Sequence, residues 1–566
     1  MFDSSLVPIP SLKGKIFKKK IRNINYVYYE YEDNYSPDHK YSLPKRTSIG
    51  KICDADTTMM YPNANYHRFF PTETATSSTK RSNMLSIGTY VVIDKILDEY
   101  DLKDILRSVI GAKYGLFLDL MAYTIVCEDN AAQYYPKYAK NHPLFSDDMH
   151  IYSDSTISDF LKQVTTDNSI DFLNQWNSKA DNKDKIYISY DSTNKVSQEG
   201  DVSIVELGHS KNDKTENIFN YAIALDITNR KMLFYEKYSG SIVDVSQLKM
   251  MIDKALSFGY TNIGLILDRG YFSISNIYYM DDHDIDFIIM VKGMKKLVRE
   301  IILSNKGKFE QLNDNYILKY SLSGTTIERL VFPRDEENRY VHLYYNGYNA
   351  AIEIEKFMQD IENMEEDIKK YIGEDHSFPD KYYDYFDIIY WHEGKEDQRI
   401  EGAIRKKKSI DEEIALCGYF CIISSDEMDA KQAIDLYKSR DESEKLFRGD
   451  KSYLGNAAER VHSYESFNSK IFVEFVALIV RQRIYTYLSD RMKELGKKVN
   501  YMTVPAAISE LEEIKIIRYG NNASYHLDQA ITKTQNEILE AFGIDSVYIK
   551  KKITEICKEI DEIDNK

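Results

Sequence analysis

The spacing of hydrophobic residues changes along the chain and separates regions of different predicted structure. Residues 1–85 contain stretches in which apolar and polar residues alternate, such as 24–35 (INYVYYEYEDNY), and these predict short strands. Over residues 86–182, apolar residues recur every three or four positions, for example at 90–111 and 114–126. That spacing places them on one helix face and predicts a helical domain.

From residue 183 the pattern becomes that of strands. Three strands, a helix and two further apolar strands follow one another before residue 297, and the strand pattern resumes after residue 411. This order implies an α/β fold with a mixed sheet covered by helices. The predicted strands are 185–191, 219–227, 231–240, 263–268, 285–293 and 417–425, and the helices are 245–259, 429–447 and 466–494.

Residues 297–411 interrupt this order and are predicted to form an insertion that contains strand-like pieces, an acidic helix and a basic loop at 405–408. The predicted organisation has five parts. They are a basic, β-rich N-terminal region (1–85), a helical domain (86–182), a discontinuous catalytic core (183–296 and 412–490), the insertion domain (297–411) and a helical C-terminal region (491–566).

Composition and charge narrow the class of protein. The 566 residues include 74 basic and 90 acidic residues, a formal net charge of −16, which argues against a uniformly basic nucleic-acid coat. The first 50 residues hold nine Lys/Arg against five Asp/Glu, either as a solvated arm or as a DNA-binding surface. Five cysteines without zinc-site spacing favour a reducing compartment. No uncharged apolar stretch reaches about 18 residues, so we expect no membrane-spanning helix.

Three acidic residues stand in predicted core elements. Asp191 ends the first strand, Asp268 ends an apolar strand, and Glu444 lies in the helix after the insertion. An unpaired carboxylate near a buried strand is costly, and Mg²⁺ or Mn²⁺, which prefer oxygen ligands, would neutralise it. The alternative is that these are ordinary turn or capping acids. Asp226 has the same local setting, and we assign it no role.

The helix around Glu444 carries several cations on one face. If a single helix advances by about 100° per residue from Tyr437, then Arg440, Glu444, Arg448 and Lys451 all fall within about 80°. A face with one carboxylate and several cations suits a site where metal and phosphate meet. A solvated face with ion pairs four residues apart would look the same.

Several motifs occur together and in order. They are Tyr437-x₂-Arg440-x₃-Glu444-x₆-Lys451, YDST at 190–193, DRG at 268–270, LGHSKN at 207–212, YSGSIVD at 238–244 and ERVHSYESF at 459–467. In these motifs and in its long strand-rich insertion, the sequence resembles bacterial insertion-sequence transposases of the IS4 type, closest in character to the IS1634-like group. That family carries a DDE triad on a ribonuclease-H-like fold.

The resemblance implies that Asp191, Asp268 and Glu444 hold two Mg²⁺ ions, with Mn²⁺ as the alternative. The implied reaction is cut-and-paste transposition, in which the enzyme binds terminal inverted repeats and cleaves a DNA strand. The freed 3′-hydroxyl then attacks a phosphodiester of target DNA, which joins the strand to the target and displaces a target 3′-oxygen. The implied partners are double-stranded DNA at the transposon ends and target, and a second copy in a homodimeric synaptic complex. The helices of residues 491–566 are a candidate dimer interface, although core packing alone would explain their apolar stripe as well. The bacterial cytoplasm is the expected compartment.

The resemblance also implies that Tyr437, Arg440 and Lys451 contact DNA phosphates, and helix geometry adds Arg448. Trp391, in the insertion, would stack on a flipped base or be a core aromatic. The basic arm that contains Lys18, Lys19 and Lys20 would bind the terminal repeats. Two alternatives stay open for the whole protein: a transposase-derived DNA-binding protein without catalysis, and a ribonuclease-H-fold nuclease without strand transfer.

Overall fold

The computed structural model of the chain divides into two compact units, Met1–Ser82 and Asn83–Lys566. Each unit is described by itself. The structure describes residues 6–564 except 13, 22–23, 36–41, 54–55, 71–80, 179–183, 198–201, 210–214, 243, 293, 312, 396, 455–457, 460–462 and 520–523.

The first unit is an antiparallel sheet with one short helix. Its strand order is β1-β5-β4-β3-β2, which makes β2 an edge strand. The small core of this unit consists of Val27, Ile49, Ile52, Met60 and Tyr66. The elements are β1 (Val7–Pro8), β2 (Ile16–Ile21), β3 (Ile24–Tyr35), β4 (Ser42–Ile52), β5 (Met59–Pro62) and α1 (Ala64–Phe69).

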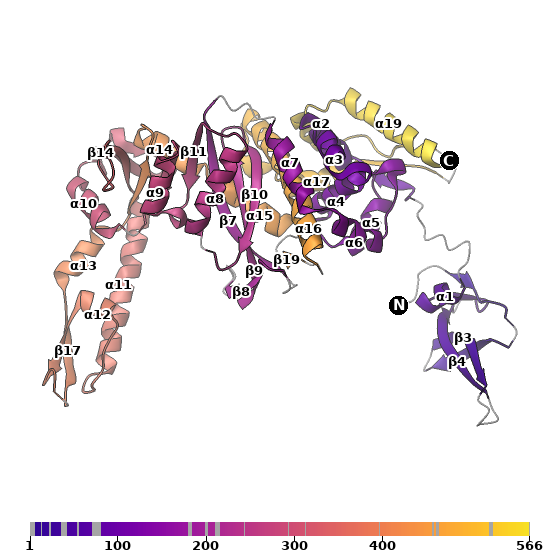
Figure 1. The fold of residues 1–566 in the computed structure, drawn as a ribbon, viewed down its shortest axis with the longest axis horizontal. Coiled ribbons are helices and arrows are strands. Elements are labelled where there is room, and N and C mark those ends of the chain that lie inside the picture. The colour runs from indigo at the N-terminus through magenta and orange to yellow at the C-terminus, as the bar shows by residue number, and fades with distance from the viewer. Residues whose placement is uncertain are drawn as a thin grey trace. The chain divides into compact units, whose positions relative to one another are not determined.

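The second unit is built around a mixed sheet with the order β10-β9-β7-β11-β12-β18-β15-β14-β13 (Figure 1). Strand β7 pairs antiparallel with β9 and parallel with β11, and β11 pairs parallel with β12. This sheet confirms the predicted α/β class with a mixed sheet. Its first strands and helices are β7 (Ile186–Ser197), β8 (Glu206–His209), β9 (Thr215–Asp226), β10 (Lys231–Ser239), α8 (Asp244–Ser257), β11 (Ile263–Leu267), α9 (Ile274–Asp281) and β12 (Asp286–Met290).

The helical N-terminal region and the C-terminal region share one hydrophobic core, which also underlies the sheet. The long helix α16 (Tyr464–Glu494) contacts α4, α6, α7 and β10 and is buried along most of its length. Strand β20 (Lys515–Ile517) pairs with β6 (Met84–Ser86), which ties the two regions together. The other elements are α2 (Gly88–Glu99), α3 (Leu102–Ile110), α4 (Tyr114–Cys127), α5 (Tyr135–Lys140), α6 (Asp154–Gln163), α7 (Thr166–Ser178), α17 (Val504–Glu512), β21 (His526–Leu527), α18 (Lys533–Ala541) and α19 (Ser546–Asp564).

One helical stretch, Leu102–Cys127, is long and apolar enough to cross a membrane by length and composition alone. Of its most apolar window, 61% is buried inside the structure, where α4 packs against α16. Core packing therefore accounts for the apolar composition of this stretch.

A buried carboxyl group in α4 fastens the loop that follows α5. Asp119 is fully buried and accepts hydrogen bonds from the backbone N–H of Phe145 (2.6 Å), the backbone N–H of Ser146 (3.3 Å) and the hydroxyl of Tyr135 (3.4 Å). Burial raises the pKa of Asp119 to about 7, although these hydrogen bonds act to lower it.

That raised pKa predicts a pH-dependent contribution to stability. Between about pH 4 and pH 7 the folded protein keeps a proton on Asp119 that the unfolded chain releases, so this contribution falls as pH rises, by about 1 kcal/mol per pH unit. Asp119→Asn cannot titrate. The melting temperature of the wild type should therefore fall from pH 5 to pH 7 relative to that of Asp119→Asn. Parallel pH profiles for the two proteins would contradict the assignment.

The predicted insertion contributes to the sheet and also forms a small core of its own. Strands β13 (Tyr316–Ile317), β14 (Leu322–Arg329) and β15 (Arg339–Tyr345) join the main sheet through β18 (Tyr419–Ser424). The remaining helices and the hairpin pack around Ile361, Ile368, Phe386 and Ile400, beyond the sheet in Figure 1. These elements are α11 (Gly347–Lys370), α12 (Asp380–Tyr385), β16 (Phe386–Trp391), β17 (Arg399–Arg405) and α13 (Lys407–Ile414); α10 (Lys295–Asn305) precedes β13.

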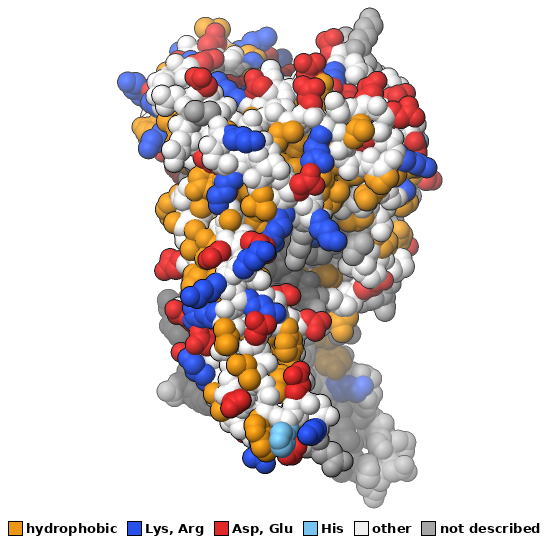
Figure 2. All heavy atoms as spheres, turned by 90° about the vertical axis from the view of Figure 1, so that its left-hand side faces the viewer, with side chains coloured by type: hydrophobic (Ala, Val, Ile, Leu, Met, Phe, Trp, Pro, Cys, Tyr) orange, Lys and Arg blue, Asp and Glu red, His pale blue; other side chains and the backbone are white. Residues whose placement is uncertain are grey.

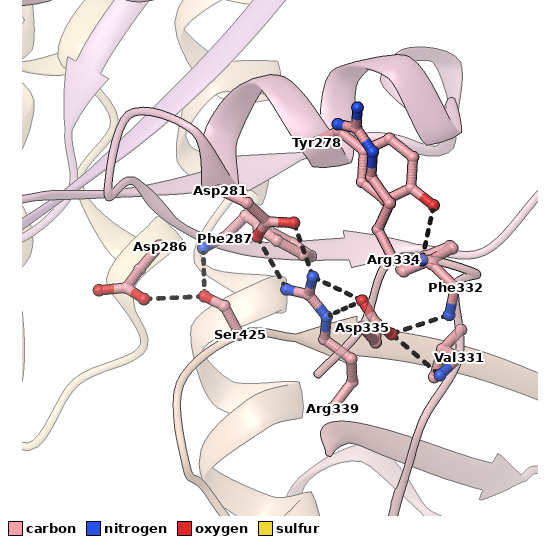
Figure 3. Close-up of polar contacts among 10 residues, drawn as sticks. All are labelled: Tyr278, Asp281, Asp286, Phe287, Val331, Phe332, Arg334, Asp335, Arg339 and Ser425. Carbon is pink, nitrogen blue, oxygen red and sulfur yellow. Dashed lines mark hydrogen bonds and ion pairs between the residues drawn. The ribbon is translucent and has the colours of Figure 1, made fainter. Parts of the chain in front are cut away.

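An ion network fastens the β14–β15 connection to α9 (Figure 3). The Arg339 guanidinium donates to Asp281 (2.6 and 2.9 Å) and to Asp335 (2.8 and 3.1 Å). The fully buried Asp335 side chain also accepts from the backbone N–H groups of Val331 and Phe332. Burial alone would raise the pKa of Asp335, but these bonds outweigh it and lower that pKa.

Removing the cation from this network should destabilise the second unit. Arg339→Ala leaves the buried Asp335 carboxylate without its counter-ion, and we expect a loss of about 3 kcal/mol in the free energy of unfolding. A matched control is Arg329→Ala, which breaks a more exposed pair with Glu300 (3.2 Å) and should cost less than about 1 kcal/mol. Chemical denaturation of the three proteins measures both effects. Equal losses for the two variants would refute the structural role of Arg339.

Candidate active site

Two of the three predicted acids lie side by side because of the parallel register of β7 and β11. The last paired residues of these strands are Leu267 and Tyr190. Asp268 directly follows Leu267, and Asp191 directly follows Tyr190, so both acids stand at the same level of the sheet. Asp191 is 18% exposed and Asp268 is 37% exposed.

The prediction that the first strand ends at Asp191 was wrong. Strand β7 continues to Ser197, because it keeps pairing with β9 as far as Val196↔Ile218. Asp191 is therefore within β7, at the point where its other neighbour, β11, ends. The Asp191 carboxylate accepts a hydrogen bond from the backbone N–H of Ser192 (2.9 Å), and that of Asp268 accepts one from Arg269 (2.7 Å).

The third acid reaches the same place on helix α15 (Asp441–Tyr453). Ser443, the residue before Glu444, is buried, and its hydroxyl donates to the hydroxyl of Ser189 on β7 (2.9 Å). That contact docks the first turn of α15 on the strand that carries Asp191. The Glu444 side chain is 52% exposed.

The guanidinium of Arg440 lies among all three carboxylates. Its nitrogens are 2.9 Å from Glu444 Oε1, 3.9 Å from Asp268 Oδ1 and 4.0 Å from Asp191 Oδ2. Burial alone would lower the pKa of Arg440, but the phenol of Tyr437 and the three carboxylates outweigh it and raise that pKa. The sequence predicted a role for Arg440 in binding DNA and did not predict this position among the acids.

The prediction of one continuous helix through Tyr437 and Glu444 was wrong. Helix α14 (Ala430–Lys438) ends before Arg440, and α15 begins at Asp441. Tyr437 is only 4% exposed, and burial raises its pKa to about 12. Arg448 is exposed on α15 and Lys451 is half-buried.

The donor set of this site fits hard divalent cations. Three carboxylates around one guanidinium leave two uncompensated negative charges, and carboxylate oxygens are the ligands that Mg²⁺ and Mn²⁺ prefer. Within the described part of the chain, no three His, Cys, Asp or Glu side chains are grouped closely enough to share one ion. The cation at the centre of the acids is Arg440, so metal ligation requires its guanidinium to move aside.

The remaining candidates lie elsewhere. Lys18, Lys19 and Lys20 are exposed on β2 of the first unit, so they belong to a sheet edge and not to an unstructured arm. Trp391 ends β16, is 47% exposed and stacks on His392 with ring centroids 3.6 Å apart. Asp226 caps the β9–β10 turn through Asn229, as an acid without a catalytic role would. His462 and parts of the LGHSKN, YSGSIVD and ERVHSYESF motifs fall outside the described residues.

The surface near the insertion carries mixed charge. Figure 2 shows the face at the left of Figure 1, where Lys and Arg side chains are interspersed with acidic and hydrophobic ones. This face alone therefore does not present one uniformly basic surface for DNA.

Sequence reasoning missed a buried ion cluster on the two elements that carry Asp191 and Glu444. Lys195 lies four residues after Asp191 on β7 and is fully buried against Asp450 and Glu474. The two-residue period of a strand places Asp191 and Lys195 on one face, but the sequence does not indicate that this face is covered.

Comparison with known proteins places the chain in a family. A model of the transposase DDE domain matches residues 192–480, slightly more than half of the chain. The protein therefore belongs to the DDE-domain transposases, a class that generally uses divalent metal ions to cleave and transfer DNA. Asp268 and Glu444 lie inside the match, and Asp191 immediately precedes it.

The similarity to a solved structure is weak, and the comparison with curated proteins gives no match. A cryo-EM structure of the piggyBac transposase synaptic complex with hairpin DNA is similar at 10% identity and a TM-score of 0.31, over 72% of this chain and 65% of that one. The chain thus spans slightly less than two thirds of that transposase chain.

Proposed function

We propose that this protein is the transposase of an insertion sequence of the IS4 type, in its IS1634-like group. It would bind terminal inverted repeats and catalyse metal-dependent strand cleavage and strand transfer. One observation carries the proposal: in a chain of the DDE family, carboxylates from β7, from the end of β11 and from α15 surround a single guanidinium. Elements far apart in sequence thus bring acidic oxygens to one place.

In this proposal, Asp191, Asp268 and Glu444 are the metal ligands, for two Mg²⁺ or Mn²⁺ ions. Bound divalent ions would supply Lewis acidity that activates the attacking hydroxyl group and stabilises the leaving 3′-oxygen. Asp191 and Asp268 supply ligands from the rigid sheet, whereas Glu444 supplies one from a helix surface. Arg440 holds the acids together and would turn toward a DNA phosphate when the ligands take up metal.

The proposed contacts with DNA phosphates come from the cations at the start of α15 and along it. Arg440 lies among the acids, and Arg448 and Lys451 lie on α15, the helix that carries Glu444, so these three cations would position the phosphates of the transposon end. The Tyr437 ring would support Arg440, whose guanidinium carbon is 5.8 Å from the ring centroid.

The other proposed contacts involve the insertion and the first unit. Exposed Trp391 would stack on a displaced base. The lysines of β2, Lys18 to Lys20, would bind the terminal repeats in a salt-dependent manner. A homodimer, joined through residues 491–566, would hold two transposon ends in the bacterial cytoplasm.

A labelled transposon-end duplex incubated with the protein, Mg²⁺ and a target plasmid tests this function. The expected result is cleavage at the end followed by joining to the target. Binding without cleavage would instead favour a transposase-derived DNA-binding protein, and cleavage without joining a nuclease on the same fold. Inverted repeats flanking the gene would support the proposal and would supply the end sequence for the assay.

A further inference from the structure

A fully buried ion cluster joins the two elements that carry Asp191 and Glu444. The Lys195 ammonium is 2.9 Å from Asp450 Oδ2 and 3.0 Å from Glu474 Oε2. Lys195 and Asp450 are 0% exposed and Glu474 is 1% exposed. Lys195 comes from β7, Asp450 from α15 and Glu474 from α16, so three separate elements meet at one cation.

This cluster lies on the same face of β7 as Asp191. Ser189, Asp191 and Lys195 are an even number of residues apart and so point to the same side of the strand. The Ser189 hydroxyl accepts a hydrogen bond from the Ser443 hydroxyl, and the Lys195 ammonium forms an ion pair with the Asp450 carboxylate. Two buried contacts therefore join α15 to β7, one through Ser443, just before Glu444, and one through Asp450, after it.

The cost of such a cluster suggests a role other than stability. Burying charges takes them out of water, and well-packed apolar residues of similar volume are often as stabilising as a buried ion pair. In some proteins, buried charged groups instead specify one arrangement of the elements that carry them.

We propose that Lys195 is a positioning residue that, through Asp450, fixes the rotation and height of α15 and thereby keeps Glu444 beside Asp191, at a position from which its side chain can turn to share a metal ion once Arg440 moves aside. This inference rests on the proposed function of the three acids. Lys195 does not touch the reacting groups, and Glu474 secures the cluster to the core helix α16.

Two isosteric substitutions separate positioning from plain stability. Asp450→Asn and Glu474→Gln each neutralise one of two equally buried carboxylates around the same ammonium, so both should lower the melting temperature to a similar extent. Only Asp450 lies on the helix of Glu444. We expect Asp450→Asn to weaken Mn²⁺ binding, followed by electron paramagnetic resonance without DNA, by about 10-fold and to lower kcat for strand cleavage by about 10–100-fold, with KM for DNA unchanged. Glu474→Gln should keep both Mn²⁺ binding and kcat.

Equal effects of the two substitutions on Mn²⁺ binding and kcat would overturn the inference. If Asp450→Asn does not fold, the apolar variant K195M/D450L/E474M takes its place: it should fold and still show weak Mn²⁺ binding, and wild-type values in it would also overturn the inference. A remote control, D94L/K103M/K552M, replaces the ion cluster of α2, α3 and α19 and should leave Mn²⁺ binding intact.

Failure of the proposed function looks different. In that case the wild-type protein either does not bind Mn²⁺ or binds it as tightly as the variant D191N/D268N/E444Q does. The inference about Lys195 then falls together with the proposed function. If the wild type binds Mn²⁺ through these acids while Asp450→Asn and Glu474→Gln behave alike, only the positioning role of Lys195 is lost.

Discussion

Replacing Glu444 by Gln should sharply reduce DNA strand cleavage while transposon-end binding persists. The amide keeps the shape of the side chain but removes the charge of one of the three carboxylates around Arg440. If Glu444 is a metal ligand, as proposed, it is worth several kcal/mol in the transition state, so we expect cleavage to fall by about 10³-fold. Because the Glu444 side chain is half-exposed on α15, stability should change by less than about 0.5 kcal/mol. Cleavage of labelled end DNA and a gel-shift assay measure the two properties.

The matched control is Glu442→Gln, two residues earlier on the same helix. Glu442 is partly buried, and its charged neighbours include Arg230 and Asp490 instead of the three acids. This variant should cleave DNA at the wild-type rate. Undiminished cleavage by Glu444→Gln would remove Glu444 from the site, whereas simultaneous loss of binding and of the folding transition would indicate damage to the fold.

Replacing Arg440 by Gln should make the protein bind Mg²⁺ more tightly in the absence of DNA and yet cleave more slowly. The guanidinium is the counter-ion of all three carboxylates. Without it they repel one another, and a divalent ion meets no competing cation. A tenfold tighter Kd adds about 1.4 kcal/mol of stabilisation by saturating Mg²⁺, because stabilisation follows RT ln(1 + [L]/Kd). Cleavage should fall by roughly 10²-fold because a donor to the phosphate is lost.

The thermal shift produced by Mg²⁺ is the direct measurement. Arg440→Gln should have a lower melting temperature than wild type without Mg²⁺ and should gain more from its addition. Arg230→Gln, which breaks the ion pair with Asp490 (2.7 Å), is the control and should show the wild-type Mg²⁺ shift. A smaller Mg²⁺ shift in Arg440→Gln than in wild type would mean that Arg440 supports the metal site instead of competing for it.

The amino-acid sequence alone determined the class of this protein and identified the three acids as candidate active-site residues. Alternating and three-to-four-residue patterns are local properties, so they identified the strands and helices of an α/β core. The spaced motif around Tyr437, Arg440 and Glu444 indicated a transposase, and the DDE-domain match confirms that class. Whether the three acids bind metal stays a prediction that the variants above test.

Only the tertiary structure decided how those residues meet. The parallel register of β7 and β11 puts Asp191 beside Asp268, and the docking of Ser443 on Ser189 brings Glu444 to them. The sequence misplaced the end of β7, because pairing with a distant strand, and not local preference, extends it to Ser197. It also could not show Arg440 among the acids or Lys195 buried beneath α15. Those positions depend on contacts between residues far apart in the chain, which no local pattern encodes.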